Sequence, residues 1–95
     1  PNEPAAPPQG FALNAAYPNP FRSSSVISFS LEQPSAVRLD LFDALGRRVA
    51  VLADGSFAAG QHEVVVDGYA LRPGLYIARL SADGVTDTIR IVRGL

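Results

Sequence analysis

The stretch that decides the fold is residues 37–52, VRLDLFDALGRRVAVL. From Val37 to Phe42, aliphatic residues alternate with other residues, a period of two that is typical of a strand with one apolar face. The turn runs from Asp43 to Gly46, because Asp favours the first position of a type I turn and Gly accepts the left-handed conformation that closes such a loop. VAVL then begins a return strand. A helix is the competing interpretation, since LFDAL is a fair helical fragment, but the β-branched residues and Gly46 favour a hairpin.

Similar patterns on both sides of this hairpin indicate five more short strands separated by turn residues. A hairpin alone cannot bury its apolar face, so the other strands must supply a second layer. Seven short strands at a spacing of about 8–12 residues predict an all-β fold, an immunoglobulin-like antiparallel β-sandwich. We expect the additional strands at residues 11–17, 26–31, 61–66, 75–81 and 85–93.

Alternation also assigns strand faces and connections. Residues 22–25 are polar and loop-like, residues 53–56 and 82–84 carry turn signals, and residues 57–60 are expected to form a loop. Pro73–Gly74 has the sequence of the central pair of a type II turn. The inward positions are expected to be Ile27, Phe29, Leu31, His62, Val64, Val66, Tyr76, Ala78, Leu80, Ile89 and Ile91.

The composition is that of one globular domain without thiol or amine chemistry. The chain has 95 residues, of which 47% are hydrophobic, and its net charge is −1. No basic excess exists to neutralise phosphates, so nucleic acid is not expected as a partner. No apolar run reaches the ~20 residues needed to span a membrane, so no membrane insertion is expected. The chain has no Cys, Lys or Met, which excludes thiolate ligands, cysteine nucleophiles and lysine Schiff bases, and we expect it to be a piece of a larger protein.

Two proline-containing segments organise the N-terminal part. Residues 1–10, PNEPAAPPQG, contain four of the eight prolines and are expected to form an extended linker, leaving residues 11–95 as the folded domain. Residues 17–21, the YPNPF segment, must form a turn or crossover, because two prolines fix φ and remove two N–H donors. We expect Tyr17 and Phe21 to anchor this segment by burying their rings.

No group of residues indicates catalysis or a cofactor. His62 is the only histidine, lacks a recognisable triad and is more simply a partly buried packing residue. The histidine spacing of a metal site and the pattern of a calcium loop are absent, and the dispersed glycines form no phosphate-binding loop. For sugar binding, Phe57 and Tyr69 are the candidates, because both fall in expected loops.

Three stretches give the sequence a resemblance to the C-terminal sorting domain (type A) of the bacterial type IX secretion system, which is also similar to the immunoglobulin-like part of flagellar hook-capping proteins. The first is Tyr17, Pro18, Asn19, Pro20 and Phe21, followed by ISFSL at residues 27–31. The second is the hairpin, with Asp43 and Gly46 in its turn. The third includes Gly60, His62, Val64, Asp67, Leu71, Gly74, Tyr76 and Leu80, and the last strand includes Arg90, Ile91, Val92 and Arg93. The resemblance covers residues 11–95.

The sequence departs from that family at three positions. Val66 stands where an aromatic residue is common, so a slimmer core is expected there. Arg90 and Arg93 replace frequent lysines, which keeps the positive charge but removes the amine.

The resemblance implies that the chain is not an enzyme but a sorting signal. Such a domain follows an exported cargo protein, is recognised in the periplasm and directs the cargo across the outer membrane to the cell surface or beyond. In many relatives a sortase-like cysteine protease removes the domain and joins the cargo to an anionic lipopolysaccharide. The segment before Phe11 would then be the cleaved region, because extended backbone enters a protease cleft more readily than a paired strand does. The last strand would be the recognition element, pairing with a receptor through its unpaired edge.

Alternatives stay open at this point. The chain could instead be a passive spacer or a carbohydrate-binding sandwich in a multi-domain secreted glycoside hydrolase, and an enzyme is the third class, without a supporting set of residues. The YPNPF segment could be a crossover that defines the fold, could contact a receptor directly, or could do both by presenting Asn19 on a rigid turn.

Overall fold

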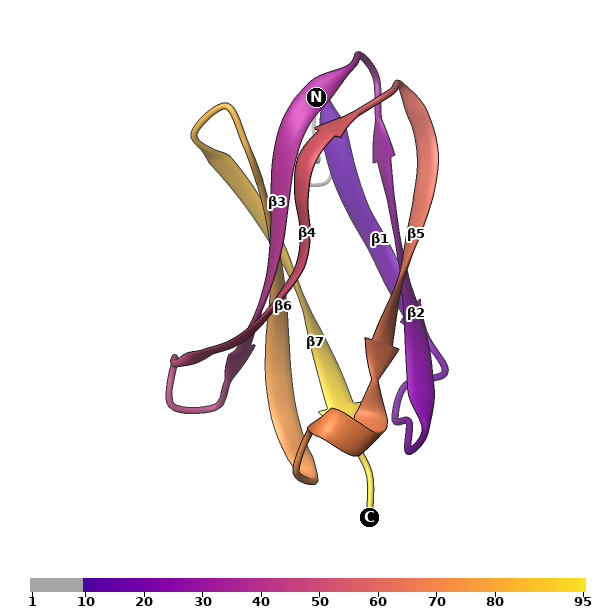
Figure 1. Ribbon diagram of the computed structural model, residues 1–95, viewed down its shortest axis with the longest axis vertical. Coiled ribbons are helices and arrows are strands. Elements are labelled where there is room, and N and C mark those ends of the chain that lie inside the picture. Colours follow the sequence, from indigo (N-terminus) through magenta and orange to yellow (C-terminus); the bar gives the residue numbers. More distant parts are fainter. Residues whose placement is uncertain (1–9) are drawn as a thin grey trace, which may run out of the picture.

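The computed structural model describes residues 10–95, which form a sandwich of two antiparallel β-sheets. One sheet has the strand order β1–β2–β5 and the other β4–β3–β6–β7, and Figure 1 shows these two layers facing each other. The elements are β1 (Phe11–Tyr17), β2 (Ser24–Leu31), β3 (Ser35–Asp43), β4 (Arg48–Phe57), β5 (Gly60–Asp67), the 3₁₀ helix η1 (Gly68–Ala70), β6 (Gly74–Ala82) and β7 (Val85–Arg93). The predicted all-β sandwich is confirmed, and the helical interpretation of residues 37–52 is excluded.

Side chains that point between the sheets form one apolar core. Of the inward positions expected from alternation, His62, Val64 and Ile89 are half-buried and the others are buried. The buried apolar residues are Phe11, Leu13, Phe21, Ile27, Phe29, Leu31, Val37, Leu39, Leu41, Val66, Tyr76, Ala78, Leu80, Ala82 and Ile91. Their alternation along the strands explains why both sheets are amphipathic and must pack face to face.

Both tight hairpins follow from their turn residues. In the β3–β4 turn, the Gly46 N–H donates to the Asp43 carbonyl oxygen (2.9 Å). Between β6 and β7, Asp83 and Gly84 have φ values of 53° and 76°. Positive φ at both central residues is the type I′ geometry, whose twist matches that of the flanking strands.

The turn expected at residues 53–56 is wrong, because β4 continues through them to Phe57. Gly55 takes a φ of 151°, a value that side-chain-bearing residues rarely adopt, within a strand rather than in a reversal. Residues 24–25, expected in a loop, already belong to β2, and the Ser25 side chain is fully buried. In both places, pairing with a neighbouring strand supplies hydrogen bonds that local sequence does not reveal.

The edges of the two sheets are protected to different degrees. On β4 the register to β3 shifts twice, which leaves extra residues at positions 49 and 52, and on β1 it shifts once at position 14. Bulges of this kind twist an edge and hinder pairing with another chain. β5 keeps a regular register with β2 along its length. The remaining edge strand, β7, is protected by the YPNPF segment.

The linker expected at residues 1–10 lies outside the described residues except for Gly10. The Gly10 carbonyl oxygen accepts a hydrogen bond from the Glu32 N–H (2.9 Å). Pairing therefore begins one residue before the expected boundary at Phe11.

Candidate functional site

β7 presents one face to solvent and fixes the other face to the core. It is the edge strand of the four-stranded sheet, next to β6. Ile91 is fully buried, whereas the alternate residues Thr86, Thr88, Arg90 and Val92 are exposed. On the inner face, the Asp87 carboxylate accepts a hydrogen bond from the N–H of Leu13 on β1 (2.9 Å), which ties β7 to the opposite sheet.

Asn19 occupies the outer edge of β7 with its side chain. Its Oδ1 accepts a hydrogen bond from the Val92 N–H (2.8 Å), and its Nδ2 donates to the Arg90 carbonyl oxygen (3.0 Å). The amide orientation is fixed by chemistry, since a backbone N–H can only donate and a carbonyl oxygen can only accept. One amide side chain therefore supplies the acceptor and the donor that a neighbouring strand would offer.

Phe21 continues the same pairing with its backbone. Its N–H donates to the Val92 carbonyl oxygen (2.9 Å), and its own carbonyl oxygen accepts from the Gly94 N–H (2.7 Å). Phe21 and Arg93 form a parallel bridge, and the Phe21 ring is only 3% exposed. The YPNPF segment thus behaves as a very short parallel strand along the end of β7.

Gly68 connects the end of β7 to the residues that follow the YPNPF segment. The Arg93 guanidinium donates from Nε to the Gly68 carbonyl oxygen (2.8 Å), and the Gly68 N–H donates to the Ser23 carbonyl oxygen (2.8 Å). A Cβ added at Gly68 would lie 1.9 Å from the Arg22 carbonyl oxygen. The approach of the two backbones is therefore possible only without a side chain.

These contacts correct one expectation about the last strand. Its position at a sheet edge is confirmed. The expectation that its edge is unpaired is wrong near Arg90 and Val92, because the Asn19 amide and the Phe21 backbone already bond to it. A receptor strand could pair along residues 90–94 only after the YPNPF segment had left.

The rings at the two ends of the YPNPF segment behave differently. Phe21 is buried as expected, but the expected burial of Tyr17 is wrong, since its side chain is 80% exposed. Tyr17 is the last residue of β1 and points to the face opposite its half-buried neighbour Ala16. The peptide bonds preceding Pro18 and Pro20 are both cis, and the Pro18 carbonyl oxygen accepts from the buried Ser25 hydroxyl (2.8 Å).

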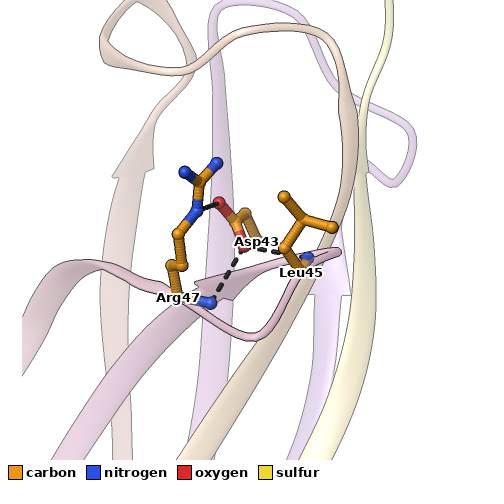
Figure 2. Close-up of polar contacts among 3 residues, drawn as sticks. All are labelled: Asp43, Leu45 and Arg47. Atoms are coloured by element: carbon orange, nitrogen blue, oxygen red, sulfur yellow. Dashed lines mark hydrogen bonds and ion pairs between the residues drawn. The ribbon is translucent and has the colours of Figure 1, made fainter.

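Asp43 organises the β3–β4 turn, as Figure 2 shows. Its Oδ1 accepts from the N–H groups of Leu45 and Arg47 (2.9 Å each), and its Oδ2 pairs with the Arg47 Nε (2.9 Å). The hydrogen bond from the Arg47 N–H is the main cause that lowers the pKa of Asp43; desolvation opposes it, and the Arg47 side chain and the Leu45 N–H add to the lowering. Gly46 has a φ of 85°, as the turn requires. These residues shape the hairpin and lie away from the YPNPF–β7 contact.

The other family-motif residues also have structural positions. The Tyr76 ring is buried near the start of β6, and its hydroxyl donates to the Arg72 carbonyl oxygen (2.7 Å), the arrangement called a tyrosine corner in immunoglobulin-like sandwiches. Gly60 and Gly74 begin β5 and β6 with φ values of 120° and 154°. The expected type II turn at Pro73–Gly74 is wrong, because its second central residue would need a φ near +80°.

His62 is a packing residue, as expected. Its ring stacks on Phe29 with centroids 5.2 Å apart, meets Phe57 edge-on at 5.1 Å, and its Nε2 lies 2.7 Å from the Ala58 carbonyl oxygen. The two candidates for sugar binding do not form one exposed platform. Phe57 is half-buried at the end of β4, whereas Tyr69 is 80% exposed in η1 at the other end of the sandwich in Figure 1.

The described part of the chain offers no metal site or membrane helix. Within residues 10–95, no three or more His, Cys, Asp or Glu side chains are grouped so that they could hold a metal ion. In the same range no helix has both the length and the apolar character that crossing a bilayer would demand.

Sequence reasoning identified the YPNPF segment and the last strand but not their mutual contact. Asn19 and Val92 are separated by 73 positions, and no local pattern connects them. Gly68 was one of several dispersed glycines. Its role depends on the close approach of Arg22, which only the tertiary structure reveals.

A family model described as "Secretion system C-terminal sorting domain" matches residues 15–93, from within β1 to the last residue of β7. No curated protein matches the chain. The matched range includes both the YPNPF segment and the strand that it holds.

Proposed function

The chain belongs to the family of secretion system C-terminal sorting domains, and from this premise we propose which surface is read during export and what happens to the cargo. Domains of this family are non-catalytic sorting signals for type IX secretion, which takes proteins to the cell surface or releases them. We propose that a cargo protein precedes this domain and that recognition takes place in the periplasm, before the outer membrane is crossed.

The outward face of β7 is the surface proposed to be read. The observation that carries this is the pairing of the YPNPF segment with the end of β7, which makes the backbone there inaccessible while Thr88, Arg90 and Val92 remain exposed. Recognition through these side chains needs no rearrangement of the sandwich. Pairing by strand addition is confined in this proposal to the first half of the β7 edge.

The family-motif residues divide into two roles in this proposal. Arg90 and Val92 belong to the recognised face, whereas Ile91 and Arg93 hold the strand in place from the other side. The YPNPF residues act as a fold-defining support for β7, and Asn19 is a positioning residue rather than a receptor contact. The turn and corner residues Asp43, Gly46, Gly60, Gly74 and Tyr76 support the sandwich.

Removal of the domain is proposed to occur within residues 1–9. A sortase-like cysteine protease would cut there and join the cargo to an anionic lipopolysaccharide, so this chain would be a substrate and not a catalyst. The support is the hydrogen bond between Gly10 and Glu32, because paired backbone resists entry into a protease cleft. We therefore propose residues 1–9 as the linker that can be cleaved and assign Gly10 to the folded unit.

A reporter fusion tests the proposed function. A periplasmic reporter is fused before residues 1–95 and expressed in a bacterium with an active type IX system and in a matched strain without the translocon. The proposal predicts surface-bound or released reporter only when both the domain and the translocon are present. Reporter that stays in the periplasm of the competent strain contradicts it.

The cleavage proposal has its own measurement. Mass spectrometry of the released domain should give an N-terminus within residues 2–10, corresponding to a cut in the linker. A new N-terminus inside β1 or β2 would contradict the proposed site.

A further inference from the structure

The outer face of the four-stranded sheet carries an apolar strip that crosses three strands. Directly opposed residues of antiparallel strands point to the same face. Phe42 on β3 is opposite Ile77 on β6, and Leu75 on β6 is opposite Val92 on β7. Leu75 and Val92 are each 37% exposed, and Phe42 and Ile77 are half-buried. These four residues form the strip.

The surface is hollowed over this strip, beside the β3–β4 turn. The hollow has a volume of about 420 Å³, and its lining includes Phe42, Leu75, Ile77, Arg79 and Asp43, whose carboxylate is paired with Arg47. An apolar hollow with a few polar groups at its border is the usual form of a site that accepts a side chain from a partner.

Three arginines surround the strip and form its rim. Phe42 on β3 is opposite Arg48 on β4 and opposite Ile77 on β6. Ile77 is in turn opposite Arg90 on β7. Arg79 places its guanidinium carbon 4.5 Å from the centre of the Phe42 ring. A guanidinium that stacks on an aromatic ring uses only its flat face. Its N–H groups, which lie in the guanidinium plane, therefore remain available to donate to a carboxylate.

The rim arginines differ from the other arginines on this side. Arg38 is paired with Asp40 (3.0 Å) and Arg47 with Asp43 (2.9 Å). Among residues 10–95, by contrast, no acidic side chain forms an ion pair with Arg48, Arg79 or Arg90.

Charge is distributed unequally between the two outer faces. The strand positions on the outer face of the four-stranded sheet include four arginines, at 38, 48, 79 and 90, and two aspartates, at 40 and 54, which gives a net charge of +2. The strand positions on the opposite outer face include Glu63 and Asp67 and no basic residue. An acidic partner is therefore attracted to one face and repelled by the other, although the whole chain has a net charge of −1.

We propose that this strip and its rim bind an acidic segment of another protein, with apolar side chains of that segment seated on Phe42, Ile77, Leu75 and Val92 and carboxylates paired with Arg48, Arg79 and Arg90. Apolar contact at the centre and charge at the rim is the usual anatomy of a specific interface. Arg90 and Val92 also belong to the outward face of β7. The assignment of the partner to the export machinery rests on the proposed function, whereas the chemistry of the segment rests on the surface alone.

Binding of a defined probe tests the surface. The probe is a fluorescein-labelled synthetic decapeptide in which Glu alternates with Val, and its fluorescence anisotropy is measured against the 95-residue chain at low and high salt. The double variant Arg79→Gln/Arg90→Gln should weaken binding at least about tenfold, since each removes a charge-assisted contact. Leu75→Ser/Val92→Ser should also weaken it. The control Arg22→Gln/Arg72→Gln removes the same charge from exposed arginines that belong neither to the rim nor to the lining of the hollow, and it should bind within about twofold of the parent chain.

Several results would overturn the inference. They are absence of binding to the Glu–Val peptide, equal binding of a Lys–Val peptide, and an equal loss in the Arg22/Arg72 control. Sedimentation of the free chain is the remaining check: a dimer that the Leu75/Val92 variant abolishes would assign the strip to a second copy instead. The reporter fusion separates this inference from the proposed function. Export with the parent chain tests the proposed function, whereas the difference between the parent chain and the Arg79/Arg90 variant tests whether this surface takes part in export. If export uses this surface, the amount of exported reporter should be at least about fivefold lower for the Arg79/Arg90 variant than for the Arg22/Arg72 control.

Discussion

Replacing Asn19 with Ala removes both hydrogen bonds between this side chain and the edge of β7. The bonds measure 2.8 Å to the Val92 N–H and 3.0 Å to the Arg90 carbonyl oxygen. A typical intramolecular hydrogen bond contributes about 0.5–1.5 kcal/mol net, so the pair contributes about 1–3 kcal/mol. Because Asn19 is exposed and water can replace it, we expect the free energy of unfolding to fall by about 1–1.5 kcal/mol.

The assay combines urea unfolding with hydrogen exchange at single amides. For a domain of this size, a loss of 1 kcal/mol lowers Tm by roughly 4–8 °C. The Val92 amide should exchange roughly tenfold faster, since about 1.4 kcal/mol corresponds to a factor of ten. Amides at the centre of β3 exchange through global unfolding, so the same loss of stability sets the upper limit of their acceleration, whereas the Val92 amide loses its own acceptor and should be accelerated at least as much.

Two further variants make the result interpretable. Asn14→Ala changes an exposed asparagine at the β1 bulge, and we expect an effect within about 0.5 kcal/mol. Asn19→Asp keeps an acceptor for the Val92 N–H but turns an ionised oxygen toward the Arg90 carbonyl. It should destabilise at neutral pH and recover part of the loss when the carboxyl is protonated and can donate again. Equal stability and equal Val92 exchange in Asn19→Ala and Asn14→Ala would refute the role assigned to the amide.

Three other predictions concern single residues. Gly68→Ala should destabilise by about 3 kcal/mol or more in urea unfolding, because its Cβ would lie 1.9 Å from the Arg22 carbonyl oxygen; a neutral result would contradict the close approach. Tyr76→Phe should cost about 1 kcal/mol by the same measurement, because it removes only the 2.7 Å hydroxyl hydrogen bond and keeps the buried ring; unchanged stability would mean that the corner does not contribute. The lowered pKa of Asp43 in the folded state means that its contribution is full above the unfolded value of 3.8 and is lost as pH falls through the folded pKa, so the stability advantage of the parent chain over Asp43→Asn should shrink in acid. A stability advantage of the parent chain that grows as the pH falls would contradict the lowered pKa of Asp43.

Local periodicity was sufficient to predict most of the fold. Ile27, Phe29 and Leu31 alternate without interruption, and all are buried in β2. The β3–β4 turn was also predictable from the sequence, because it follows from the local conformational preferences of Asp43 and Gly46 and not from distant contacts.

Errors arose where a neighbouring strand changed the local preference. Asp54 and Gly55 are typical turn residues, yet they lie in β4 opposite Arg38 and Val37. The backbone bonds of that pairing outweigh turn propensity, and the glycine absorbs an unusual φ.

The candidate site was predictable in its parts but not in its assembly. The prolines of the YPNPF segment indicated a crossover, whereas the burial of Phe21 but not Tyr17 depends on which side of β7 the segment reaches. The contact between Asn19 and Val92 joins opposite ends of the chain, and the rim of arginines appears only once β3, β4, β6 and β7 are placed side by side.

The most direct test of the central claim uses substitutions rather than a truncation, because deleting residues 90–95 would also remove Ile91 from the core. In the reporter fusion, export by a type IX-competent strain is compared between the parent chain and Thr88→Glu/Arg90→Glu, two exposed positions on the outward face of β7, once circular dichroism shows that the variant is folded. We expect the folded variant to leave the reporter in the periplasm, while Gln61→Glu/Arg72→Glu, which shifts the net charge by the same amount at two exposed positions outside β7, permits export. Undiminished export of the Thr88/Arg90 variant would contradict the claim that the export machinery recognises this face of the last strand.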